Sequence, residues 1–161
     1  MTTTAVNNIE RFADDIEVGD AIPAVIHRPT EVQLFRYCAV TWNAHRIHFD
    51  AAYAESEGYP NVLVQSHLHG AFFTSLCTGW AGEHGDLRRL QYSVRRFACP
   101  GDLLAVRGTV ESIDDSVDGG VLVRVELREV RESDGADCAI GDADIFLPHR
   151  SAVAGGEGEK R

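Results

Sequence analysis

The sequence predicts an α+β fold in which five antiparallel strands form a sheet wrapped around a long central helix. After one early strand, the N-terminal half has the patterns of helices and loops, whereas the C-terminal half has consecutive strand patterns. This segregation is typical of α+β folds and not of alternating βαβ units. Apolar residues between positions 66 and 85 recur every four residues, as expected of a helix with a continuous buried stripe. A curved sheet around that helix would bury the apolar faces of both.

The N-terminal half contains one predicted strand and two predicted short helices. The strand covers residues 21–27, and Thr30 and Gln33 then have the spacing of a capping box at the start of a helix over residues 31–40. Asp50 is placed to cap a second helix, AAYAESE, that ends at Gly58. Four residues share one face of the first helix at helical spacing and are predicted to be core. They are Val32, Phe35, Cys38 and Ala39.

The central helix is predicted over the segment SHLHGAFFTSLCTGWAGEHG. Its buried stripe consists of Leu68, Phe72, Leu76 and Trp80. Ser66 is the predicted N-cap, Gly79 and Gly82 loosen the far end, and Gly85 is expected to end the helix.

Four strands are predicted after residue 86, separated by turn signals rich in Pro, Gly and Asp. Their sequences are LRRLQYSVRRFA, LLAVRGTVESID, VLVRVELREVRE and CAIGDADIFLP. In the third, charged residues at 124, 126 and 128 alternate with apolar residues at 123, 125 and 127. This alternation predicts one solvated face and one packed face.

Length and composition indicate one globular domain, over residues 9–150, with flexible tails at 1–8 and 151–161. The 161 residues are 44% hydrophobic and 25% charged. No apolar run approaches the ~20 residues that cross a bilayer, and the N-terminus does not resemble a secretory leader, so we expect a cytoplasmic protein that does not span a membrane. The four cysteines form no C-x-x-C pair and are expected to be buried thiols.

The charge distribution argues against nucleic-acid binding, because the formal net charge is −10. Positive charge is concentrated only at Arg88-Arg89 and Arg95-Arg96. Two interpretations stay open for these pairs: they are solvated positions on a strand and its adjoining loop, or they contact an anionic part of a ligand.

A metal site is not predicted, although four histidines lie within 25 residues, at His45, His48, His67 and His69. The His67-Leu68-His69 pair superficially resembles the His-x-His of a cupin, but no glutamate follows at the required spacing and the pair falls at a helix start. Nucleophilic catalysis has little support, since neither Ser66 nor Ser75 lies in a G-x-S-x-G elbow. We predict no metal and no cofactor.

Acid–base catalysis is the chemistry that the segment TWNAHRIHFD, residues 41–50, supports best. A histidine can accept and return a proton near neutral pH. His48 precedes a capped helix that would hold its backbone still, and the amide of Asn43 can orient a hydroxyl or water but cannot act as a base. Taken singly, these residues are better explained as a capping or core histidine and a turn-forming asparagine. Only the whole segment favours catalysis.

Residues 35–68, FRYCAVTWNAHRIHFDAAYAESEGYPNVLVQSHL, resemble the signature segment of the MaoC-type hydratase/dehydratases, which have the hot-dog fold. The segment is most similar to the branch with the mitochondrial type 2 hydroxyacyl-thioester dehydratases and mesaconyl-CoA hydratase-like proteins. In that branch a Phe-Asn-x-His-Arg/Lys-Ile-His-Tyr-Asp run is typical. Trp42 and Phe49 stand here where the branch usually has Phe and Tyr.

The resemblance implies reversible hydration of a 2-enoyl thioester, or dehydration of an (R)-3-hydroxyacyl thioester, on coenzyme A or an acyl carrier protein. His48 falls on the catalytic histidine, and Asn43 falls where broader MaoC enzymes have an aspartate. His45 is the candidate auxiliary acid. The Gln65-Ser66 pair stands where the family usually has His-Gly, so the Ser66 N–H is the expected donor to the thioester oxygen, and His67 is expected to serve as a helix-start residue.

A partner is also expected, because a lone hot-dog domain exposes a sheet edge and an apolar helix flank. The substrate tunnel of this fold usually lies at the dimer interface. We expect a homodimer, or a heteromer with a second hot-dog protein. A non-catalytic hot-dog subunit of such a heteromer is the alternative function. A thioesterase on the same fold is disfavoured, because it would want a carboxylate on the central helix and Glu83 lies at its far end.

Overall fold

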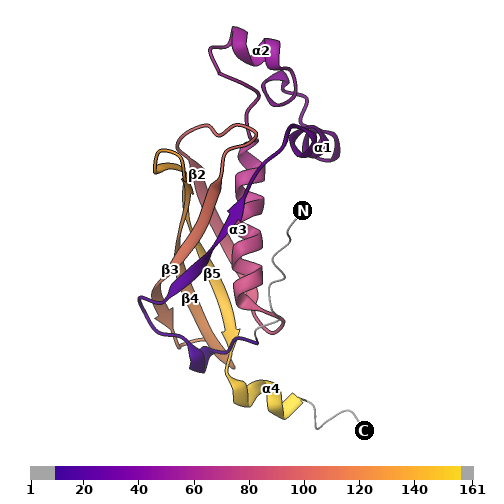
Figure 1. Ribbon diagram of the computed structural model, residues 1–161. Coiled ribbons are helices and arrows are strands. Elements are labelled where there is room, and N and C mark those ends of the chain that lie inside the picture. The colour runs from indigo at the N-terminus through magenta and orange to yellow at the C-terminus, as the bar shows by residue number, and fades with distance from the viewer. Residues whose placement is uncertain (1–9, 157–161) are drawn as a thin grey trace.

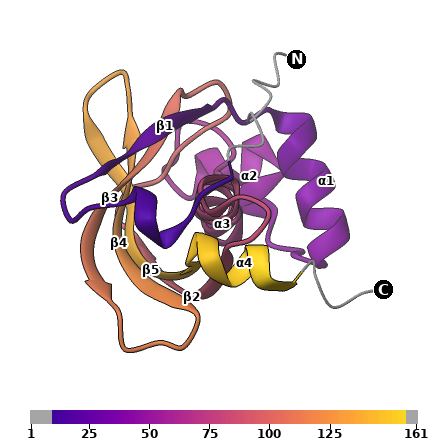
Figure 2. The ribbon, with the colours of Figure 1, turned by 90° about the horizontal axis from the view of Figure 1, so that it is seen from below.

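A computed structural model describes residues 10–156 and has a single antiparallel sheet curled around one helix, α3 (Ser66–Ala81). Figure 2 shows α3 lying in the concave side of the sheet. The strand order is β1-β3-β4-β5-β2, with every neighbouring pair antiparallel. The strands are β1 (Ala21–His27), β2 (Asp86–Val94), β3 (Leu104–Asp114), β4 (Gly120–Arg131) and β5 (Ala136–Pro148). The predicted α+β fold is confirmed.

The core lies between α3 and the inner face of the sheet. The predicted stripe of α3 is buried, since Leu68, Phe72, Leu76 and Trp80 are at most 7% exposed. On β4 the residues at 123, 125 and 127 are fully buried, whereas those at 126 and 128 are exposed. Three of the four cysteines are buried, and burial raises the pKa of the Cys77 thiol to about 12. The alternating pattern of β4 and the three buried thiols agree with the sequence, whereas Cys99, also predicted to be buried, is only half-buried.

Both ends of α3 differ by a few residues from the prediction. Gln65 is the N-cap and Ser66 is already helical, so the prediction of a Ser66 cap is wrong. The helix ends at Ala81, because Gly82 adopts φ 73° and ψ −163°, a conformation open mainly to glycine. Gly85, the predicted stop, is instead a close contact: a Cβ there would lie 2.7 Å from the Ala81 Cβ.

Three short helices form a layer beyond one end of the sheet, as Figure 1 shows for α1 and α2. They are α1 (Glu31–Thr41), the 3-10 helix η2 (Arg46–His48) and α2 (Ala51–Ser56). The predicted caps are present: the Thr30 hydroxyl accepts from Gln33 N–H at 3.1 Å, and Asp50 accepts from Tyr53 N–H at 3.0 Å. This layer carries the segment that the sequence singles out for chemistry.

The predicted core face of α1 is wrong for three of its four members. Val32 is 61% exposed, Phe35 is 62% exposed and Ala39 is exposed, while Cys38 is buried. Helical periodicity marks an apolar face but does not say what covers it. Because α1 lies outside the sheet, only its edge with Leu34 and Cys38 is buried within the chain.

The region after β5 begins with a helix, α4 (Arg150–Gly156), where the sequence predicted a flexible tail from residue 151. The Arg150 guanidinium pairs with Asp15 at 2.9 Å, which ties the start of α4 to the N-terminal 3-10 turn η1 (Ala13–Asp15). The other parts of the expected tails, 1–8 and 157–161, lie outside the described residues. Among residues 10–156, no helix is long and apolar enough to cross a membrane, and the cytoplasmic location stays a prediction.

Candidate active site

The segment between α1 and α2 is held in a fixed turn by its own side chains. The Asn43 Oδ1 accepts from His45 N–H at 3.2 Å, and the His45 Nδ1 accepts from Ile47 N–H at 3.4 Å. The first contact is an Asx turn, and the second caps η2. Asn43 thereby uses its carbonyl oxygen for the turn and keeps its Nδ2 donors for another partner.

His48 is positioned by the segment that leads into α3. Its Nδ1 lies 2.9 Å from the carbonyl oxygen of Leu63, and Leu63 N–H donates to the Ile47 carbonyl at 2.9 Å. A carbonyl only accepts hydrogen bonds, so Nδ1 carries the proton and Nε2 is the basic nitrogen. Burial lowers the pKa of His48, the contact with Leu63 opposes this shift, and the charge of His45 adds to it. His48 is therefore neutral at pH 7 and able to accept a proton.

A pocket of about 480 Å³ brings together four of the five predicted site residues: Asn43, His45, His48 and Ser66. These residues come from the turn after α1, from η2 and from the start of α3. The rest of the lining is Ile47, Leu63, Val64, His67, Val94, Arg95, Arg96 and Phe97. The pocket thus contains both the predicted acid–base residues and the N-terminal end of α3.

The start of α3 offers free donors to this pocket. Within the described chain, the N–H groups of Ser66 and His67 have no backbone acceptor, because they belong to the first helical turn. The positive end of the helix dipole lies at the same place. A ligand oxygen with negative charge would be stabilised there.

Gln65, the fifth predicted residue, has a structural role for its side chain. The side chain is fully buried, and its Nε2 donates to the Leu34 carbonyl at 2.8 Å and lies 3.0 Å from the Cys38 Sγ. These contacts fasten α1 to the start of α3. The side chain of Gln65 therefore lies in the contact between the two helices and away from the lining of the pocket.

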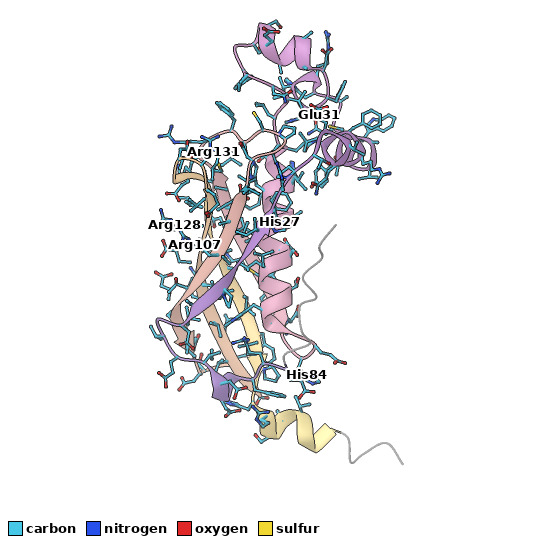
Figure 3. The ribbon with its side chains drawn as sticks, in the orientation of Figure 1. His27, Glu31, His84, Arg107, Arg128 and Arg131 are labelled. Carbon is cyan, nitrogen blue, oxygen red and sulfur yellow. The ribbon has the colours of Figure 1, made fainter. Side chains whose placement is uncertain are left out.

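One buried polar group was missed by the sequence interpretation. The His69 Nδ1 donates to the Glu129 Oε1 at 2.5 Å, and both side chains are fully buried between α3 and β4. His27 stacks on Phe72, which also lies against His69, and Figure 3 shows His27 beside α3 near one end of β1. A signal was present, because Glu129 continues the inward-facing positions 123, 125 and 127 of β4.

Four buried polar atoms in this region have no hydrogen-bond partner among the described residues. They are His27 Nε2, Gln65 Oε1, His69 Nε2 and Glu129 Oε2. Burial lowers the pKa of His27, against the opposing charge of Glu129. Residues 10–156 contain no group of three or more His, Cys, Asp or Glu side chains arranged to hold a metal ion.

The two predicted arginine pairs lie in different surroundings. Arg88 pairs with Asp86 at 3.2 Å, and Arg89 pairs with Asp142 and with Asp144. These two arginines are solvated positions on β2, one of the two interpretations of the sequence. Arg95 and Arg96 follow the end of β2 and line the pocket with His48.

Comparisons with known proteins place the chain in a family. Residues 9–99, more than half of the chain, match the hydroxyacyl-thioester dehydratase type 2 family. The mesaconyl-C(4)-CoA hydratase of Chloroflexus aurantiacus is 36% identical over 102 residues, which are 63% of this chain and 35% of that protein. The mitochondrial hydroxyacyl-thioester dehydratase type 2 of Schizosaccharomyces pombe is 46% identical over 44 residues, 27% of this chain and 15% of that protein.

The chain thus spans about a third or less of the length of these curated relatives. Among solved structures, a MaoC-like dehydratase from Rhodospirillum rubrum has the same fold, with a TM-score of 0.73 and 19% identity over 87% of this chain and 98% of that one. The resemblance stated from residues 35–68 is confirmed. In fold, the chain is similar to the hot-dog domain of that MaoC-like dehydratase. By its family match, the chain belongs to the hydroxyacyl-thioester dehydratase type 2 family.

Proposed function

We propose that the protein catalyses the reversible hydration of 2-enoyl thioesters, or the dehydration of (R)-3-hydroxyacyl thioesters, carried on coenzyme A or an acyl carrier protein. The observation that supports this most directly is the state of His48. Its Nδ1–H is committed to the Leu63 carbonyl, so a basic Nε2 is available in the pocket that also holds Asn43 and the start of α3. Family membership supports the same reaction class.

In the dehydration direction, the His48 Nε2 removes the C2 proton of the substrate. Negative charge then develops on the thioester oxygen, where the Ser66 N–H and the dipole of α3 stabilise it. The bond from C3 to its hydroxyl oxygen breaks, and that oxygen leaves as water after receiving a proton. His48 returns its proton for this step, with His45 as the auxiliary acid. Hydration follows the same steps in reverse.

Asn43 holds the C3 hydroxyl, or the incoming water, in this mechanism. Its Oδ1 is occupied by the His45 N–H, so the Nδ2 amide is the group that can donate to the oxygen of the substrate. An amide cannot take the proton that an aspartate would accept at this position. The acid–base work therefore falls on the histidines.

The substitution His48→Ala tests the proposal in an assay of crotonyl-CoA hydration. Loss of a general base costs about a hundredfold to ten-thousandfold in rate, so we expect kcat to fall by that order. His84→Ala is the matched control, because His84 follows the far end of α3 and lies near Glu10, remote from the pocket. Turnover that survives His48→Ala unchanged would refute the role of His48.

A homodimer is the proposed assembly, since α1 presents an exposed apolar face that nothing in the described chain covers. We define the α1 apolar face as Val32, Phe35, Ala39 and Trp42, of which Trp42 is 90% exposed. The sheet also ends in two edge strands, β1 and β2. Pairing of two chains would shield these surfaces from water.

The alternative function is a non-catalytic hot-dog subunit that pairs with a catalytic one. The observation that favours it is Asn43, which stands where broader MaoC enzymes carry a carboxylate. Activity of the purified chain alone, together with its solution mass with and without a co-expressed second hot-dog protein, separates the two. An inactive chain that becomes part of an active heteromer would support the alternative.

A further inference from the structure

We propose that Arg95 and Arg96 form a phosphate-binding subsite at the mouth of the pocket, which takes the phosphate of the substrate's phosphopantetheine carrier. The proposal rests on the proposed function, because it assigns the carrier end of the thioester whose acyl end lies at His48. Coenzyme A and acyl carrier protein share this phosphate chemistry. The shared group, and not either carrier, is what the two guanidinium groups would recognise.

The position of Arg95 and Arg96 supports this subsite. Arg95 and Arg96 line the 480 Å³ pocket with His48, and they also line a second, open hollow of about 700 Å³. Both N–H groups donate to the Cys138 carbonyl, at 2.7 and 3.2 Å, so the backbone of the pair is held against β5. A long thioester that reaches from His48 to the outside would pass these two side chains.

The charges of Arg95 and Arg96 also support this subsite. Within residues 10–156, neither Arg95 nor Arg96 has a carboxylate at ion-pair distance, whereas Arg88 and Arg89 do. Two adjacent unpaired arginines in a chain of net charge −10 form a local positive site. Such a site attracts an anion that would be repelled by most of the remaining surface.

The neighbouring carboxylates are already occupied by other arginines. Asp134, in the wall of the open hollow, pairs with Arg131 at 2.7 Å, and Asp137 pairs with Arg128 at 2.7 Å. Arg128 and Arg131 are labelled in Figure 3, where Arg131 lies at the end of the sheet nearest α1 and α2. The negative charges of Asp134 and Asp137 are therefore already paired, so Arg95 and Arg96 stay available to a ligand.

Guanidinium chemistry fits the proposed ligand. The planar fork of an arginine donates two parallel hydrogen bonds to phosphate oxygens, and two adjacent arginines can bind one phosphate or a pyrophosphate from two directions. The proposed mechanism assigns neither side chain a role at the reacting carbons. The subsite should thus affect substrate binding and leave the chemical step unchanged.

The test is the double variant Arg95→Gln/Arg96→Gln, assayed with crotonyl-CoA and with phosphate-free crotonyl-pantetheine. Loss of charged hydrogen bonds to phosphate predicts a rise of about tenfold in KM for crotonyl-CoA with kcat unchanged. The KM for crotonyl-pantetheine should not change. Arg88→Gln/Arg89→Gln is the matched control and should leave both KM values as in the parent protein.

Equal KM values for parent and variant on crotonyl-CoA and on a crotonyl-loaded carrier protein would overturn the proposal, as would an equal rise for crotonyl-pantetheine. A rise with only one of the two carriers identifies the source of the phosphate and supports the subsite. Calorimetric binding of free coenzyme A and of the unacylated carrier protein to both variants needs no turnover. If the protein proves inactive, loss of that binding in Arg95→Gln/Arg96→Gln alone still supports the subsite, and equal binding by parent and variant refutes it.

Discussion

At the scale of the residue, the protonation state of His48 decides what the pocket can do. Burial favours the neutral ring of His48, and the hydrogen bond to the Leu63 carbonyl selects its tautomer. The charge of His45 further disfavours protonation of His48. The first effect comes from the packing around His48, and the other two come from Leu63 and His45, which are not its direct neighbours in the sequence. A base that stays neutral below its ordinary pKa remains active in mildly acidic solution.

The pH profile of kcat/KM tests this arrangement. Because burial lowers the pKa of His48 in the folded protein, the acidic limb of the profile should lie below pH 6.5, the ordinary value. In His45→Gln a like charge is removed, so the limb should move to higher pH. A limb at or above pH 6.5 in the parent protein would contradict the inferred state of His48.

At the scale of the element, buried polar contacts fix how α3 meets its neighbours. Gln65 fastens the start of α3 to α1, and one turn later His69 fastens it to β4 through Glu129. Both contacts lie where the helix leaves the sheet and approaches the pocket. They hold the free N–H groups of the first turn in a fixed direction toward the site.

Replacing only one member of the His69–Glu129 pair should lower the free energy of unfolding strongly. Replacing both members with apolar residues should lower it much less. In His69→Leu the Glu129 carboxylate loses its buried partner, so the free energy of unfolding should fall by about 3–5 kcal/mol. In His69→Leu/Glu129→Met both polar groups are gone, and most of that loss should be recovered. Urea denaturation of His69→Leu, Glu129→Met and the double variant measures the coupling, and additive losses would contradict it.

At the scale of the whole molecule, the layer of α1, η2 and α2 stands outside the curled sheet (Figure 1). This layer exposes apolar side chains to solvent. Phe35 and Cys38 also line a small pocket of about 220 Å³ with Trp42 and Phe49. Exposed apolar surface of this kind costs free energy in water. A second copy of the chain on the α1 apolar face would remove that cost and close the pocket region to solvent.

The double variant Phe35→Ser/Trp42→Ser tests this surface. If the α1 apolar face is the dimer interface, the variant should shift from dimer to monomer by at least tenfold in dissociation constant, measured by analytical ultracentrifugation. Val18→Ser is the control, because Val18 is 63% exposed at a site just before β1. An unchanged dissociation constant in the double variant would place the interface elsewhere.

The sequence by itself determined the elements and most of the candidate residues. β4 alternates with period two, the stripe of α3 repeats every four residues, and Thr30 and Asp50 cap their helices, so local patterns were enough for these features. The segment at 41–50 also predicted His48, Asn43 and His45 as candidate site residues, and all three line one pocket. Each of these properties depends on neighbours along the chain.

Only the tertiary structure decided which faces are covered and which polar groups meet. Periodicity placed Phe35 in the core, but α1 lies outside the sheet and leaves it exposed. The sequence could not show that His69 pairs with Glu129, 60 positions away, or that the Gln65 side chain bonds to α1. It also treated the two arginine pairs alike, whereas in residues 10–156 carboxylates pair with Arg89 and none lies at ion-pair distance from Arg95. Burial and charge pairing depend on residues brought together by folding, and no local pattern contains that information.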